Sequence, residues 1–93
     1  MNNGSYRVSF DSIARKQFRR LDTTVRRKIT EALRRLAIDP RMANPNVIPM
    51  EGEDLTYRLR IGGYRVVYEI YDDELLILVV GTGSRGQIYK KRR

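Results

Sequence analysis

Two alternating segments around Gly62-Gly63 constrain the fold of this 93-residue chain more than any other feature. Apolar and polar residues alternate over 55–60 and again over 64–71. A period of two residues is typical of strands with one buried face. Two glycines between such segments favour a two-residue hairpin turn, because that turn needs positive φ. The sequence therefore predicts an antiparallel hairpin whose register is fixed by the turn.

This register decides which side chains share a face. Arg60 is predicted to lie opposite Arg65, and Leu59 opposite Val66. Because side chains alternate across a strand, one face is apolar and should pack on the rest of the protein. That face carries Leu55, Tyr57, Leu59, Tyr64, Val66, Tyr68 and Ile70. The opposite face carries Thr56, Arg58, Arg60, Arg65, Val67 and Glu69.

The first half of the chain has a different period. Residues 6–10 alternate as a strand does. Apolar residues then recur at helical spacing over 13–21 and over 25–36, which predicts two helices with apolar stripes. Candidate N-caps precede both helices: Asp11, Ser12 and Asp22. Asp39-Pro40 should end the second helix. We expect two consecutive helices joined by a short link, as in a helical hairpin.

The remaining segments complete the expected fold. Residues 39–54 contain all three prolines and predict a surface connection with little regular structure. Residues 74–80 are rich in Leu, Ile and Val, as a central strand is, whereas 81–86 is glycine-rich and predicted to be flexible. Residues 84–93 form a basic C-terminal segment. We expect one α+β domain over 1–93: an N-terminal strand, a helical hairpin and a three-stranded antiparallel meander, with the helices on one sheet face.

The charge balance indicates an anionic partner. Nineteen Lys and Arg face eleven Asp and Glu, which gives a net charge of +8. Most of these cations are arginines, whose planar group matches phosphate oxygens. Nucleic acid and acidic proteins both remain candidate partners on charge alone.

Composition also predicts the cellular location of the protein and the absence of disulfides, metals and cofactors. The chain has no cysteine and no histidine, so neither a disulfide nor an ordinary zinc site is expected, and we expect no metal and no cofactor. The polar start carries no apolar signal segment, and the longest apolar run, 75–80, is far too short to span a membrane. We expect a soluble cytoplasmic protein.

The polar face of the predicted hairpin is the strongest candidate site. Like charges directly opposite each other, as at Arg60 and Arg65, are unfavourable in a sheet, and Arg58 lies diagonally nearby. An anionic ligand would offset that cost, so we predict a phosphate site. The alternative is a solvated face in which Glu69 or the acidic cluster at 51–54 balances the arginines.

Two segments resemble a known family. The run 57–70, YRLRIGGYRVVYEI, is similar to the signature hairpin of the RelE/ParE toxin superfamily, and 83–89, GSRGQIY, resembles its C-terminal element. With the strand and helices before them, the resemblance covers nearly the whole chain. It implies a RelE-like fold and a toxin of a type II toxin–antitoxin system. RelE-like members are ribosome-dependent endoribonucleases that cut mRNA in the A site, and an acidic antitoxin wraps and inhibits them in a hetero-oligomer. ParE-like members instead poison DNA gyrase.

The resemblance also implies site residues. Those expected to be catalytic are Arg58, Arg65, Arg85 and Tyr89, and those expected to bind RNA are Arg60, Lys90 and Lys91. The sequence departs from the best-known RelE-type enzymes at two positions. Thr56 stands where they carry a lysine, and Ser84 stands where many relatives have a histidine. We therefore expect a metal-free mechanism of arginines and a tyrosine, and a degenerate nucleic-acid-binding module without activity remains an alternative.

Overall fold

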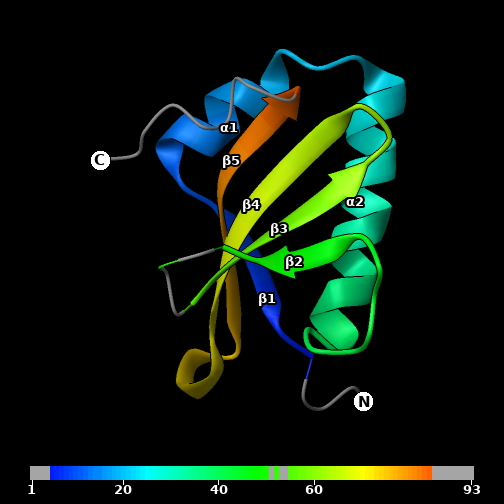
Figure 1. The fold of residues 1–93 in the computed structure, drawn as a ribbon. Coiled ribbons are helices and arrows are strands. Elements are labelled where there is room, and N and C mark those ends of the chain that lie inside the picture. Colours follow the sequence, from blue (N-terminus) through cyan, green and yellow to red (C-terminus); the bar gives the residue numbers. More distant parts are fainter. Residues whose placement is uncertain (1–4, 51, 53–54, 85–93) are drawn as a thin grey trace.

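The fold is a five-stranded mixed sheet with two helices on one of its faces (Figure 1). This computed structural model describes residues 5–50, 52 and 55–84. The elements are, in order, β1 (Arg7–Phe10), α1 (Ser12–Arg19), α2 (Thr23–Ile38), β2 (Val47–Pro49), β3 (Thr56–Ile61), β4 (Tyr64–Tyr71), the 3-10 turn η1 (Asp72–Glu74) and β5 (Leu76–Ser84). The strands lie in the order β1-β5-β4-β3-β2, with β1 parallel to β5 and every other pair antiparallel. The predicted α+β class and its antiparallel meander, β3-β4-β5, are confirmed.

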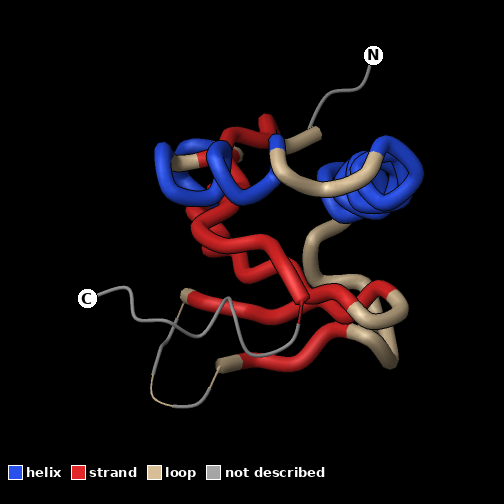
Figure 2. The backbone as a smooth tube through the Cα atoms, turned by 90° about the horizontal axis from the view of Figure 1, so that it is seen from above, coloured by secondary structure: helices blue, strands red, loops and turns tan. Residues whose placement is uncertain are grey.

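Local sequence signals set the helix bounds. The Asp11 carboxylate accepts a hydrogen bond from the backbone N–H of Ala14 at 2.8 Å, which caps α1. Asp22 precedes α2, and α2 ends at Ile38, just before Asp39-Pro40. Seen from above, both helices lie on the same side of the curved sheet, and they diverge rather than run alongside each other (Figure 2). Among the described residues, neither helix combines the length and apolar character needed to cross a bilayer.

The core lies between the helices and the apolar face of the sheet. The helices contribute Ala14, Ile29, Leu33 and Leu36. The sheet contributes Leu59, Val66, Tyr68, Ile70, Ile77 and Val79. Burying one large aliphatic side chain contributes about 1.5–3 kcal/mol, so this cluster supplies much of the driving force for folding. The rings of Tyr57 and Tyr68 stack across the hairpin, with 5.8 Å between their centroids.

The hairpin has the predicted register. Arg60 pairs with Arg65 and Leu59 with Val66, and the pairing continues without a shift to Thr56. Gly62 has a φ of 58°, the left-handed conformation that this turn requires of a glycine. The prediction of the apolar face is wrong for one residue. Leu55 precedes β3 and is 44% exposed, because it lies outside the paired strand.

The connection before β3 is more regular than expected. It contains β2, which pairs with β3 and forms one edge of the sheet. Backbone hydrogen bonds extend this pairing at both ends, from the Arg60 N–H to the Asn46 carbonyl at 2.8 Å and from the Met50 N–H to the Thr56 carbonyl at 2.9 Å. The proline in this strand is tolerated because an edge strand needs donors on one side only.

The glycine-rich end of β5 is also ordered where flexibility was expected. The strand continues through Gly81 and Gly83 to Ser84, and both glycines are buried. They pair with Val67 and Arg65 of β4, so the neighbouring strand stabilises a segment whose own strand propensity is low. The expectation of a flexible stretch is therefore wrong for 81–84, and 85–86 lies outside the described residues.

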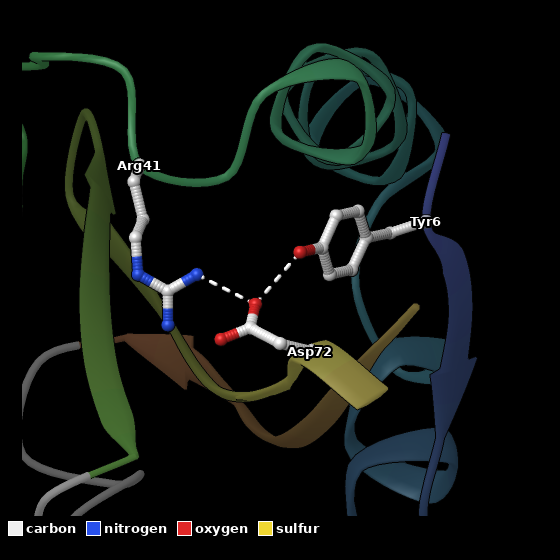
Figure 3. A network of polar contacts seen from close by, with 3 residues as sticks. All are labelled: Tyr6, Arg41 and Asp72. Atoms are coloured by element: carbon white, nitrogen blue, oxygen red, sulfur yellow. Dashed lines mark hydrogen bonds and ion pairs between the residues drawn. The ribbon is translucent and has the colours of Figure 1, made fainter. Parts of the chain in front are cut away.

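A polar cluster of Tyr6, Arg41 and Asp72 links three segments near the turn between β4 and β5 (Figure 3). One carboxylate oxygen of Asp72 accepts a hydrogen bond from the Tyr6 hydroxyl and an ion-paired hydrogen bond from Arg41, each at 2.7 Å. These contacts lower the pKa of Asp72, with the Tyr6 hydrogen bond as the largest cause, and raise the pKa of Tyr6. The cluster joins the start of β1, the connection after α2 and the turn before β5.

Candidate nucleic-acid interface

Three arginines from two adjacent strands lie on the sheet face opposite the helices. Arg58 and Arg60 come from β3, and Arg65 comes from β4. Arg60 and Arg65 are paired, which places their Cβ atoms about 4.5–5.5 Å apart. Arg58 pairs with Val67, so its side chain lies one row away on the same face. We call these three residues the arginine face.

Its surroundings differ from an open, solvated surface. Thr56 and Val67, which share this face, are 4% and 6% exposed. Arg58 and Arg65 are half-buried, and Arg60 is exposed. Electrostatic attraction is stronger where water is partly excluded, so a phosphate held by half-buried guanidinium groups binds more strongly than one on an exposed surface. The burial pattern therefore favours an anion site over a purely solvated face.

Two contacts define the borders of this face. Beside Arg65 the register places Gly83, so β5 projects no side chain next to that guanidinium. Toward the other end of β4, the Tyr71 hydroxyl donates a hydrogen bond to a carboxylate oxygen of Glu69 at 2.7 Å. Among the described residues of β3 and β4, Glu69 is the acidic residue on this face, and it lies opposite Thr56 and diagonally across from Arg58.

The C-terminal members of the expected site cannot be placed. Arg85, Tyr89, Lys90 and Lys91 lie outside the described residues. The chain enters this segment from Ser84, which pairs with Tyr64 beside the hairpin turn. The structure thus brings Arg58, Arg60 and Arg65 together, and the roles of the other four remain predictions.

One positioning contact was not anticipated. The backbone N–H of Thr82 donates to the side-chain oxygen of Gln17 at 2.9 Å. β1 ends at Phe10, opposite Val79, so Thr82 lies beyond the end of its partner strand. Gln17 of α1 takes the place of that strand and fixes the last residues of β5. Sequence gave no signal for this contact, because it joins residues 65 positions apart.

Two tyrosines outside this face are poor candidates for proton acceptors. Burial raises the pKa of Tyr68, and the nearby Tyr57 raises it further. The hydrogen bond to Asp72 raises the pKa of Tyr6. A tyrosine that takes up a proton near neutral pH needs the opposite shift.

Comparison with solved structures identifies the fold. The toxin–antitoxin complex of E. coli RelBE matches with a TM-score of 0.77 and 29% identity, over 87% of this chain and 98% of that one. The archaeal RelE–RelB complex from Pyrococcus horikoshii OT3 matches with a TM-score of 0.75 and 28% identity, over 89% of this chain and 98% of that one. The helix pair over one face of this mixed sheet is the RelE fold.

Sequence comparison agrees. The mRNA interferase toxin RelE of Escherichia coli (strain K12) is 31% identical over 81 residues, which are 87% of this chain and 84% of that protein. The family profile described as "ParE toxin of type II toxin-antitoxin system, parDE" matches residues 8–89. The chain therefore belongs to the ParE toxin family of type II toxin–antitoxin systems, within the RelE/ParE superfamily.

Proposed function

We propose that this toxin is an endoribonuclease that cuts mRNA in the ribosomal A site and so inhibits translation. The observation that carries the proposal is the arginine face, where Arg58, Arg60 and Arg65 are held close together by the pairing of β3 with β4. Three such groups in one place match the negative charge of an RNA backbone. Two relatives at 31% identity are named mRNA interferases, which supports the same activity.

The chemistry uses a nucleophile that RNA supplies itself. The 2′-hydroxyl attacks the adjacent phosphorus as it loses its proton, the bond to the 5′-oxygen breaks, and that oxygen takes up a proton from water. The products are a 2′,3′-cyclic phosphate and a 5′-hydroxyl end. Arg58 and Arg65 bind the scissile phosphate and stabilise its added negative charge in the transition state. Arg60, Lys90 and Lys91 contact the RNA backbone on either side.

The remaining roles fall on the C-terminal segment. Tyr89 accepts the proton of the 2′-hydroxyl, and Arg85 stabilises the phosphorane or the leaving oxygen. Thr56 and Ser84 provide neither the lysine nor the histidine of related enzymes, so the free enzyme should be slow. Alignment of the RNA by the ribosome supplies the missing rate.

The natural inhibitor is an acidic antitoxin bound in a hetero-oligomer. Related structures are described as complexes of RelE with RelB, and one holds an antitoxin peptide. Binding to the folded toxin would stabilise it by mass action. The protein acts in the cytoplasm, where ribosomes are found.

A cell-free translation assay with mapped RNA ends tests this function. The toxin should stop translation and leave cuts at A-site codons, and EDTA should not abolish the cuts on pre-assembled ribosomes. Tyr89→Phe should slow single-turnover cleavage by roughly ten- to ten-thousandfold, the range for general acid–base groups. Loss of cleavage on chelation, with ribosomes shown to be intact, would contradict the metal-free mechanism.

Inhibition of DNA gyrase is the second candidate function. The observation that favours it is the family profile itself, which is that of ParE toxins. A supercoiling assay run beside the translation assay separates the two. Normal translation with blocked supercoiling would establish the gyrase function, and no effect in either assay would leave a nucleic-acid-binding module without activity.

A further inference from the structure

The last residues of β5 have a strand on one side only. β1 ends at Phe10, and the final backbone contact beside it runs from the Asp11 N–H to the Val79 carbonyl at 2.9 Å. On the other side, β4 continues to pair with β5 as far as Ser84. Within the described part of the chain, residues 80–84 therefore have no strand on the side where β1 has ended.

A β-bulge directs one N–H of this segment toward the open side. Tyr68 of β4 pairs with Val79. The residue before Tyr68 pairs with Gly81, which leaves Val80 as the extra residue of a bulge. Ahead of the bulge, odd-numbered residues direct their backbone groups toward β1, as the carbonyl of Val79 does. The extra residue shifts this alternation by one, so the N–H of Thr82 is directed to that side.

Gln17 of α1 binds this N–H. Its side-chain oxygen Oε1 accepts a hydrogen bond from the Thr82 N–H at 2.9 Å. α1 packs against β5 (Figure 1). The helix is held there by the Asp11 cap and by the ring of Phe18, whose centroid lies 4.9 Å from that of Phe10. An anchored helix thus supplies the acceptor that a longer β1 would have supplied.

Water does not readily replace this acceptor, because Thr82 is almost fully excluded from solvent. The residue is 1% exposed, and its Oγ1 is buried without a hydrogen-bond partner among the described residues. A buried N–H that loses its acceptor is left unsatisfied, which destabilises the arrangement that buries it. Without the oxygen of Gln17, we therefore expect the end of β5 to leave its present position.

The position of this strand end affects the arginine face. Gly83 follows Thr82 and pairs with Arg65, so β5 supports one side of the strand that carries this arginine. Arg85 comes two residues after Gly83 in the sequence. The strand end that Gln17 holds is therefore joined, through backbone pairing and through the chain itself, to both groups that the proposed function places at the phosphate.

We propose that Gln17 is a positioning residue for RNA cleavage: it holds the Thr82 N–H and so keeps the end of β5 in register with Arg65. The inference rests on the proposed function, because the reaction that it affects is the cleavage of mRNA. A misplacement of about 1 Å at a reacting group costs roughly a hundredfold in rate. Ribosome affinity should not change, because many phosphate contacts of the basic surface determine it.

Two substitutions of similar size separate the acceptor oxygen from the bulk of the side chain. Gln17→Met keeps the length of the side chain without the oxygen, and it should lower the single-turnover cleavage rate on programmed ribosomes by roughly ten- to a hundredfold. Gln17→Glu keeps an acceptor oxygen and should cleave close to the parental rate. Ser12→Glu adds the same charge at an exposed residue of α1 and is the charge control.

Two further measurements separate positioning from a general loss of stability. Amide hydrogen exchange at Thr82, followed by NMR, should be roughly tenfold or more faster in Gln17→Met and unchanged in Gln17→Glu, whereas the Ile77 amide in the middle of β5 should keep its protection. Ile70→Val removes one methylene from the core, so it should lower the melting temperature and leave the cleavage rate unchanged.

Three outcomes would overturn the proposal. The first is a parental single-turnover rate in Gln17→Met, which would make the contact structural only. The second is an equal loss of rate in Ile70→Val. The third is a loss in Gln17→Glu as large as that in Gln17→Met while Ser12→Glu keeps the parental rate. A parent that does not cleave would instead refute the nuclease, and hydrogen exchange at Thr82 would still decide whether Gln17 holds the end of β5.

Discussion

The two faces of the β3–β4 hairpin follow from the same alternation of side chains, yet they have opposite effects on folding. The helix-side face places Leu59 and Val66 in a core that is almost fully excluded from water. The other face places Arg60 opposite Arg65, a pairing that does not favour folding. The sheet gains stability from the first face and holds the proposed phosphate-binding arginines in place with the second. Damage to one face should therefore leave the property of the other intact. Three changes on the hairpin test this separation, and a fourth, outside both faces, gives a reference.

The largest expected effect is on the arginine face. Arg65→Ala should lower ribosome-dependent cleavage by roughly a hundred- to thousandfold, because it removes a contact to charge that develops in the transition state. Its melting temperature should change little, since no core side chain is altered. Cleavage kinetics and thermal unfolding measured on one preparation check both statements. Arg27→Ala, an exposed arginine of α2, is the control, and a drop in its activity equal to that of Arg65→Ala would contradict the assignment.

The core face should give the converse result. Leu59→Ala should lower the free energy of unfolding by about 2–5 kcal/mol, the cost of a cavity at a buried leucine. Urea titration gives this value. Cleavage per folded molecule should stay close to that of the parent, because the arginines are on the other side of the sheet. A thousandfold loss of cleavage in fully folded Leu59→Ala would show that the two faces are coupled.

Removing the Tyr68 hydroxyl while keeping its ring tests how a polar group affects the stability of the core face. This oxygen is buried and has no hydrogen-bond partner among the described residues. Tyr68→Phe should therefore leave stability unchanged or raise it, by up to about 1–3 kcal/mol, the usual cost of an unsatisfied buried group.

The same residue predicts a pH dependence. The folded protein raises the pKa of Tyr68, so the unfolded chain loses this proton first as the pH rises. The neutral Tyr68 side chain makes its full contribution to the free energy of unfolding below the unfolded pKa of about 10. This contribution is lost at higher pH. Stability should fall above about pH 10 in the parent and fall less in Tyr68→Phe, as measured by urea titration across that range. Identical alkaline profiles would contradict the buried, neutral state.

The smallest expected effect lies away from both faces. Asp72→Asn removes the charge that Arg41 and Tyr6 bind at the surface. The pKa of Asp72 is lowered in the folded protein, so its contribution is present above the unfolded pKa of about 3.9 and is lost as the pH falls through the folded value. The variant should melt slightly lower than the parent at pH 7, and the difference should vanish in strong acid. A difference that persists at low pH would exclude the ion pair as its cause.

Sequence alone was informative where local rules govern. The turn at Gly62-Gly63 determined the hairpin register, and the register determined the arginine face. The Asp11 cap and the stop before Pro40 are equally local. Alternation also assigned Leu59, Val66, Tyr68 and Ile70 to the buried side without any knowledge of what would cover them.

Non-local contacts decided the rest. β2 is a strand because it pairs with β3, although the prolines of the 39–54 connection favour an irregular structure. Gly81 and Gly83 are ordered because β4 supplies partners for them. The Gln17–Thr82 contact joins residues that are distant in the sequence, so no local pattern predicts it. For Arg85 and Tyr89, resemblance remains the source of their assignment.

The parallel pairing of β1 with β5 has a consequence for folding during synthesis. Arg7 pairs with Leu76, so the first strand cannot pair until a strand much further along the chain has been synthesised. At about 5–20 residues per second, that delay is roughly 3–14 s. During this time α1 and α2 have been synthesised but the sheet that covers their apolar sides is incomplete. The sheet that covers the apolar sides of α1 and α2 therefore cannot be completed until β5 has been made, seconds after both helices.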